Sequence, residues 1–110
     1  MAGEHAAGKL LGHMVYFTLK DKSPEAVEKL LASARKYLSG HPGTIHFSIG
    51  THDPELDRPV NQKFDVALQL VFQTREAQDA YQVSERHVQY IEENKDNWES
   101  VQVFDANVMS

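Results

Sequence analysis

The chain has 110 residues, of which 41% are hydrophobic and 25% are charged, so it has room for one domain with a single core. Its formal net charge of -5 and its scattered Lys and Arg residues exclude the basic surface that nucleic acids or anionic membranes require. The absence of Cys excludes disulfides and a thiolate nucleophile, and no apolar run approaches the ~18 residues of a membrane span. We therefore expect a cytoplasmic protein without nucleic-acid or membrane partners.

The first predicted elements are a strand and an amphipathic helix. Leu10–Lys20 alternates between two faces, as a strand does. Ser23 and Pro24 then begin a helix, because a hydroxyl N-cap is followed by Pro at the first helical position, and Gly40 ends it. The apolar stripe of this helix has a period of 3.6 and consists of Val27, Leu30, Leu31, Ala34 and Leu38.

A second strand and a long loop follow. Thr44–Gly50 alternates, and its inward side chains are predicted to be Ile45, Phe47 and Ile49. Residues 52–62 contain two Pro and several charges, and about ten residues is long for a connection between two strands. The loop either covers another surface or is a solvated connection.

The strongest pattern in the chain is the strand Lys63–Gln73. Its large apolar side chains alternate perfectly and are predicted to share one face: Phe64, Val66, Leu68, Leu70 and Phe72. A helix over 74–83 follows, and Ser84 is predicted to cap a second helix over 85–95, whose apolar stripe includes His87 and extends to Trp98. Val101–Val108 is the last strand.

The order of these elements predicts an α+β fold. Strand, helix, strand, strand, helix, strand is the βαββαβ order of a ferredoxin-like domain, a four-stranded antiparallel sheet with its helices on one face. We expect residues 1–9, which are small and polar, to form a disordered lead, and residues 10–110 to form the single domain.

The sheet face away from the helices is predicted to be apolar. A monomer would leave this patch in water, whereas two sheets packed face to face would bury it and close an α/β barrel. We therefore expect a homodimer through this outer face, whose main contact residues would be Met14, Tyr16, Val71, Phe104 and Val108. The alternative is a one-sided sheet that tolerates scattered apolar residues.

Several stretches resemble the stress-responsive A/B barrel (Dabb) domain family of the dimeric α/β barrel superfamily. The start GHMVYFTLK, with His13 and Phe17, is similar to the opening strand of that family. FDVALQLVF followed by Tyr81 and by His87 six positions later is similar to its most distinctive part, and NWESVQVFDA is similar to its closing strand. The resemblance spans His13 to about Asp105 and implies the same barrel fold.

The resemblance also implies a site. Some family members, the olivetolic acid cyclase type, close a linear polyketide by an aldol reaction without metal or cofactor. By that resemblance Tyr81 and His87 would be catalytic, in a pocket between helices and sheet that binds a small, hydrophobic, oxygenated molecule. Further ligand-binding residues are predicted to be His13, Val15, Phe17, Leu68, Leu70, Trp98, Val101 and Val103.

Other interpretations of the same residues remain open. His87 could be a core histidine bonded to a backbone carbonyl, Tyr81 a core aromatic, and the protein a non-catalytic ligand-binding or structural dimer in a stress response. Haem binding or monooxygenase-like chemistry is a weaker alternative, drawn from the wider superfamily. The six His residues show neither i,i+4 nor His-x-His spacing, so we expect no metal and no cofactor.

Overall fold

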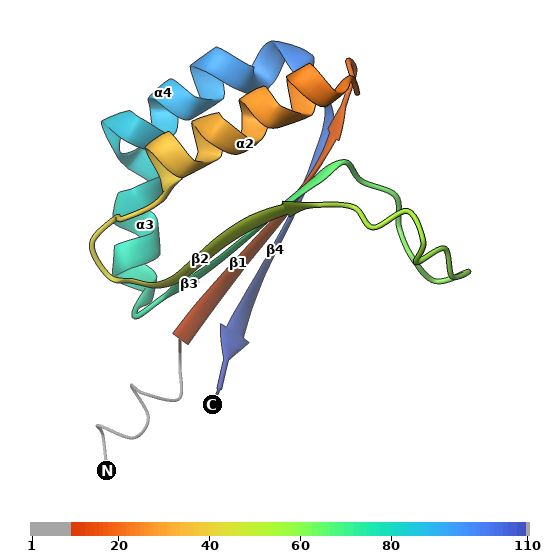
Figure 1. Ribbon diagram of the computed structural model, residues 1–110. Coiled ribbons are helices and arrows are strands. Elements are labelled where there is room, and N and C mark those ends of the chain that lie inside the picture. Colours follow the sequence, from red (N-terminus) through yellow and green to blue (C-terminus); the bar gives the residue numbers. More distant parts are fainter. Residues whose placement is uncertain (1–9, 110) are drawn as a thin grey trace.

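The computed structural model describes residues 10–109, so the lead predicted for residues 1–9 lies outside the described residues. Figure 1 shows one layer of helices on one face of a sheet. The elements, in chain order, are β1 (Leu10–Leu19), α2 (Pro24–Leu38), β2 (Thr44–Thr51), β3 (Val66–Phe72), α3 (Arg75–Val83), α4 (Glu85–Asn94), the 3₁₀ turn η1 (Lys95–Asn97) and β4 (Trp98–Val108).

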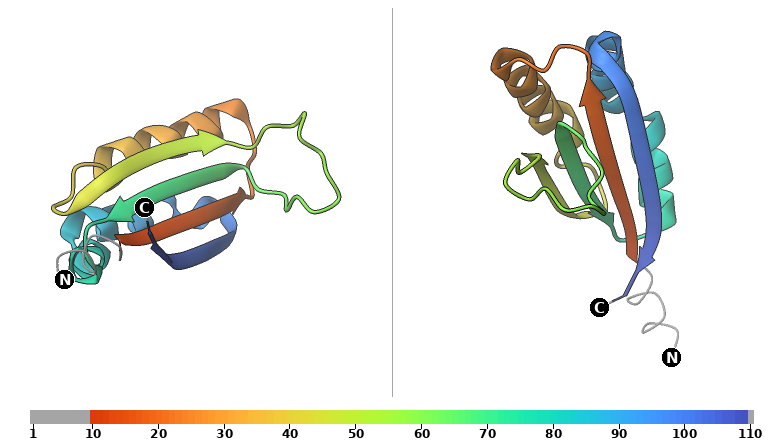
Figure 2. Two further views of the ribbon diagram at one scale, coloured as in Figure 1. Left: turned by 90° about the horizontal axis from the view of Figure 1, so that it is seen from below. Right: turned by 90° about the vertical axis from the view of Figure 1, so that its right-hand side faces the viewer.

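The sheet has the strand order β2-β3-β1-β4, and all three strand pairs are antiparallel. This topology confirms the ferredoxin-like fold, with the second helical segment divided into α3 and α4. Strands β1 and β3 are central, whereas β4 is an edge strand. Figure 2 shows β4 at the margin of the sheet, and its left view shows the outer face without a covering helix.

Helix α2 forms as its sequence predicts. The side chain of Ser23 accepts a hydrogen bond from the backbone N–H of Ala26, and Pro24 occupies the first turn, where its missing N–H costs nothing. The helix ends at Leu38, and Gly40 follows with a φ of 73°, a conformation that favours glycine. The residues buried against the sheet are Leu30, Leu31, Ala34 and Leu38.

A single residue joins α3 to α4. The hydroxyl of Ser84 donates to the carbonyl of Tyr81, 2.9 Å away, and accepts from the backbone N–H of His87 at 3.2 Å. The same side chain therefore ends one helix and begins the next. As a consequence, Tyr81 and His87 come from opposite sides of one sharp turn.

The inner face of the sheet supplies the core. Val66, Leu68, Leu70 and Phe72 of β3 are each at most 1% exposed, which confirms the alternation in this strand. Phe64 is an exception, because β3 begins only at Val66. The chain bends at Asp65, and the ring of Phe64 packs 5.1 Å from that of Tyr16 on the outer face. The prediction that Phe64 shares the inner face was wrong.

Two further predictions need correction. Ile45 was expected to point inward, but the β2–β3 register shifts between Thr44 and His46, and Ile45 is 53% exposed. Trp98 was expected on the apolar stripe of the last helix. It is instead the first residue of β4, since α4 ends at Asn94 and η1 turns the chain.

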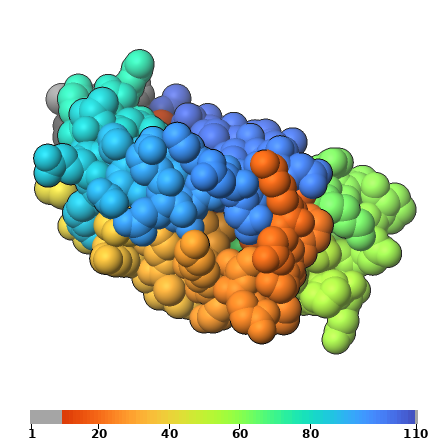
Figure 3. All heavy atoms as spheres, turned by 90° about the horizontal axis from the view of Figure 1, so that it is seen from above, coloured from red at the N-terminus to blue at the C-terminus, as the bar shows by residue number. Residues whose placement is uncertain are grey.

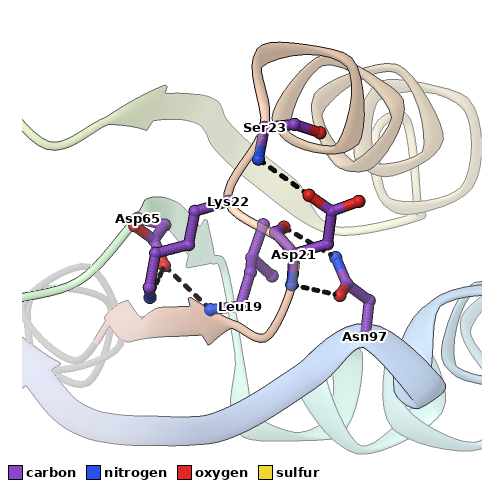
Figure 4. A network of polar contacts seen from close by, with 6 residues as sticks. All are labelled: Leu19, Asp21, Lys22, Ser23, Asp65 and Asn97. Atoms are coloured by element: carbon purple, nitrogen blue, oxygen red, sulfur yellow. Dashed lines mark hydrogen bonds and ion pairs between the residues drawn. The ribbon is translucent and has the colours of Figure 1, made fainter.

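The 52–65 loop between β2 and β3 projects beyond one end of the sheet (Figures 1 and 3). Its C-terminal end is fixed by Asp65, whose Oδ2 accepts from the backbone N–H of Leu19 and from Nζ of Lys22, both at 2.8 Å. Next to this contact, Asp21 and Asn97 bond to each other twice, which ties the β1–α2 connection to η1, just before β4 (Figure 4).

Candidate functional site

A cavity of about 250 Å³ lies between the helices and the inner face of the sheet. Its size is just below the usual range of small-molecule sites, about 300–1,000 Å³, so it fits a small ligand. The inner-face residues Val101 and Val103 of β4 are 39% and 49% exposed, because the helices do not fully cover this edge strand. The cavity is lined by His13, Val15, Phe17, Leu38, Leu68, Tyr81, Gln82, His87, Tyr90, Ile91, Trp98, Val101, Val103 and Asp105.

This lining includes every residue that the sequence predicted for the site except one. Leu70 is fully buried in the core and is not among the lining residues. Five lining residues were not predicted for the site: Leu38, Gln82, Tyr90, Ile91 and Asp105. Two of these could have been found by helical spacing, because Tyr90 and Ile91 lie three and four positions after His87 and share its face of α4.

Tyr81 and His87 are in direct contact. Their ring centroids are 4.7 Å apart, in an edge-to-face arrangement. Tyr81 is only 2% exposed and also packs against the rings of His13, His41 and Phe72, at 5.9, 4.9 and 5.1 Å. The phenol is thus held by surrounding rings beside the imidazole.

The surroundings of the two side chains shift their pKa values in opposite directions. Burial raises the pKa of Tyr81 well above its usual value, so the phenol keeps its proton at neutral pH. Burial, helped by the proximity of His13 and His41, lowers the pKa of His87, although a Gln82 backbone contact acts the other way. The imidazole of His87 is therefore neutral near pH 7, and its position in the first turn of α4 favours the same state.

The three histidines around Tyr81 differ in their partners. Nε2 of His41 donates to the carbonyl of Tyr37 at 2.7 Å, a bond that fixes this ring structurally. Nδ1 of His13 lies 2.6 Å from Oδ1 of Asp105, and because a carboxylate accepts, this nitrogen is the donor. Nδ1 of His87 is buried without a hydrogen-bond partner.

Unpartnered polar atoms concentrate in this cavity. Within residues 10–109, four buried side-chain polar atoms lack a partner: Thr44 Oγ1, His87 Nδ1, Tyr90 Oη and Trp98 Nε1. Three of them belong to residues that line the cavity, and only Thr44 does not. Because an unsatisfied buried polar group costs roughly 1–3 kcal/mol, such a concentration is typical of a ligand site.

A larger cavity of about 540 Å³ lies on the outer side of the sheet, against the 52–65 loop. Tyr16, Phe64 and Phe104 contribute its aromatic wall. None of the unpartnered atoms found within residues 10–109 belongs to it, and it coincides with the face predicted to dimerise. We therefore place the candidate site in the inner cavity.

No group of three or more His, Asp or Glu side chains in residues 10–109 is placed to hold a metal ion. None of the helices described between those residues is long and apolar enough to cross a membrane.

The fold and this cavity define a ferredoxin-like domain with a ligand-sized pocket under its helices. Residues 11–108 match the family model of the stress responsive A/B barrel domain (Dabb). This match covers most of the chain, and the protein belongs to that family. A search of curated proteins gave no match.

Solved structures support the same fold. A dimeric ferredoxin-like protein of unknown function from Thermobifida fusca superposes with a TM-score of 0.78 at 18% identity, covering 92% of both chains. A Dabb family protein from Mesorhizobium loti gives 0.75 at 23% identity, covering 93% of this chain and 99% of that one. The hydroxynitrile lyase of Passiflora edulis gives 0.76 at 16% identity, covering 92% and 94%. At these identities the likeness establishes the fold alone.

Proposed function

We propose that this chain is a cofactor-free enzyme of the cyclase or lyase type, acting on a small, hydrophobic, oxygenated molecule in the inner cavity. The observation that carries the proposal is the contact between Tyr81 and His87, 4.7 Å between ring centroids, with Nδ1 of His87 buried and unpartnered. Two adjacent groups whose pKa values are moved apart are the usual signature of an acid and a base.

The two residues would divide the work of one proton transfer. The neutral imidazole of His87 accepts a proton from a carbon next to a carbonyl group, and the C–H electron pair becomes the enolate. The phenol of Tyr81 remains protonated and donates a hydrogen bond to the enolate oxygen. The enolate carbon then attacks a second carbonyl of the same molecule, and His87 returns the proton to the new alkoxide.

His13 is the second imidazole of the site. Its Nδ1–H is engaged by Asp105, which leaves Nε2 as an acceptor in the neutral ring. Asp105 would therefore orient His13 toward the cavity, as a carboxylate orients histidine in many hydrolytic sites. We assign His13 to binding a hydroxyl group of the ligand rather than to the proton transfer, because Tyr81 is in closer ring contact with His87 than with His13.

The working unit in this proposal is a homodimer. The protein from Thermobifida fusca is described as dimeric, and the outer face of this chain carries Phe104, which is 55% exposed. Exposed apolar patches of this kind usually mark an interface. The proposed contact surface consists of Met14, Tyr16, Val71, Phe104 and Val108.

The test compares Tyr81→Phe and His87→Gln with the wild-type protein. After a screen of small dicarbonyl compounds for turnover, His87→Gln should lower kcat by roughly 10²–10⁴ and Tyr81→Phe by roughly 10²–10³. The double variant should lose less than the product, because the two groups act on one transition state. Thermal melts of each variant establish that the chain is folded.

The same measurements test two alternatives, a non-catalytic ligand-binding dimer and a structural role for Tyr81 and His87. A non-catalytic ligand-binding dimer would bind compounds from the screen without converting them. A purely structural role for Tyr81 and His87 predicts a lowered melting temperature for His87→Gln and unchanged ligand binding in both variants. Either result would remove the catalytic assignment.

A further inference from the structure

The inner cavity holds a second pair of polar groups that the proposed reaction does not use. Tyr90 of α4 and Trp98 of β4 both line the cavity, and both Tyr90 Oη and Trp98 Nε1 are buried without a partner. Tyr90 as a whole is only 2% exposed. This pair needs an explanation of its own, because buried tyrosines and tryptophans normally find a hydrogen-bond partner.

The two rings are rigidly placed. Their centroids are 5.7 Å apart, and the ring of Phe17 packs against both, 6.3 Å from Tyr90 and 5.0 Å from Trp98. Neither ring can leave the cavity without disturbing the core around Phe17, which is 2% exposed. The unpartnered hydroxyl and N–H are therefore fixed features of the cavity and are held ready for a partner.

The helix places Tyr90 on the same side as the reacting groups. Tyr90 follows His87 by three positions in α4, and residues at this spacing lie on one face of a helix. Burial and the proximity of Tyr81, the other phenol of the site, both raise the pKa of Tyr90. All three side chains therefore belong to one cavity.

The chemistry of the pair restricts what it can bind. The indole N–H can only donate, so its complementary group is an acceptor oxygen, and a phenol that keeps its proton can donate to the same oxygen. Among the described residues that line the cavity there is no Lys or Arg to balance a negative charge. The acceptor is thus a neutral oxygen, such as that of a ketone or phenol, rather than a carboxylate.

We propose that Tyr90 and Trp98 form a specificity subsite that recognises a second, neutral oxygen atom of the ligand. The proposal rests on the proposed function, since the first oxygen is the one bound by Tyr81. It narrows the ligand to a neutral molecule with hydrogen-bonding oxygens at two positions. A molecule with one oxygen would leave the buried donors unsatisfied, and sites of this kind reject such analogues strongly.

The experiment uses the single Trp of the chain as its reporter. Because Trp98 is the only tryptophan, its indole N–H signal in a ¹H–¹⁵N spectrum is assigned without ambiguity. The probes are resorcinol, phenol and toluene, which carry two, one and no oxygen atoms on similar rings. We expect resorcinol to bind most tightly, and only the oxygenated probes to move the indole proton downfield.

Tyr90→Phe is the decisive variant, because it keeps the ring and removes only the hydroxyl. It should lower the affinity for resorcinol by roughly threefold to tenfold and leave toluene unchanged. Tyr37→Phe is the matched control, since the Tyr37 hydroxyl bonds to Glu93 at the surface, outside the cavity. It should change no affinity. Thermal melts check that both variants are folded.

The failures of the two proposals are distinguishable. Equal affinities for the three probes, or a Tyr90→Phe variant that binds resorcinol like wild type, would overturn the subsite and leave the cavity and its Tyr81–His87 pair in place. If none of the probes moves the Trp98 signal at millimolar concentration, the cavity does not take small oxygenated rings. That result would overturn the subsite, whereas the proposed function is decided separately by the turnover of dicarbonyl compounds in the wild type and in the Tyr81 and His87 variants.

Discussion

Asp105 holds the imidazole of His13 across the β1–β4 strand pair. The two residues are directly opposite in the register, and Oδ1 of Asp105 lies 2.6 Å from Nδ1 of His13. His13 is 4% exposed, whereas the side chain of Asp105 is half exposed. A half-exposed carboxylate therefore determines which nitrogen of a buried imidazole carries the proton.

In Asp105→Ala, the proton of the His13 ring should no longer be confined to Nδ1. The carboxylate requires a proton on Nδ1, and without it either nitrogen can carry the proton. Ring ¹⁵N shifts of His13 should indicate a proton held on Nδ1 in the wild-type protein and a mixture of the two tautomers in the variant. Asp96→Ala, which removes an exposed acid that is not among the lining residues, should leave the spectrum unchanged. An unaltered tautomer in Asp105→Ala would show that Asp105 does not orient the ring.

Acidification should destabilise the protein through His87. Its pKa in the folded state lies below the usual 6.5, mainly because burial disfavours the charged ring. The unfolded chain therefore binds the proton first as the pH falls, and the stability contributed by neutral His87 is present above about pH 6.5. It is lost as the pH falls through the folded-state pKa.

Denaturant titrations at pH 7.5 and pH 5 measure this effect. The free energy of unfolding should decrease more from pH 7.5 to pH 5 in the wild type than in His87→Gln, whose side chain does not titrate. Equal slopes for the wild type and His87→Gln would contradict the assigned burial of His87.

Asp65 should stabilise the fold mainly through its hydrogen bond to the backbone of Leu19 and less through its ion pair with Lys22. It accepts from Lys22, which is exposed, and from the backbone N–H of Leu19, which is 1% exposed. Asp65→Ala leaves that buried N–H without a partner and should lower the free energy of unfolding by about 1–3 kcal/mol. Lys22→Ala removes only the surface pair and should cost less than about 1 kcal/mol. Equal costs would assign the effect to the ion pair.

The fold could be predicted because local signals agree with one another. Ser23, Thr74 and Ser84 each cap the helix that follows, and the alternation of β3 matches its burial. Where the prediction failed, the cause was a local break that periodicity does not reveal. A bend at Asp65 and a register shift in β2 reversed the faces of Phe64 and Ile45.

The candidate site was predictable only in part. Tyr81 and His87 were predicted through family resemblance, and helical spacing could have added Tyr90. The role of Asp105 could not be read from the chain, because His13 is 92 positions away and the contact depends on the β1–β4 register. Long-range strand pairing of this kind leaves no local pattern in the sequence.

The last prediction separates the two faces of β4. Phe104 and Val103 are neighbours with similar exposure, 55% and 49%, but alternation places Phe104 on the outer face and Val103 on the wall of the inner cavity. Both can be replaced by Lys, which adds the same charge to the same edge strand. The pair is therefore a matched test of the proposed homodimer.

Phe104→Lys should abolish the dimer, because an unpaired charge in an apolar interface costs several kcal/mol. A loss of about 3 kcal/mol raises the dimer dissociation constant roughly a hundredfold, which sedimentation at micromolar concentration detects as monomer or insoluble protein. Val103→Lys should remain dimeric, since its charge lies on the opposite face, but it should lose binding of resorcinol in the inner cavity. A dimer that survives Phe104→Lys and dissociates with Val103→Lys would place the interface on the inner face of β4 and contradict the proposed surface. A monomeric wild type would exclude the homodimer altogether.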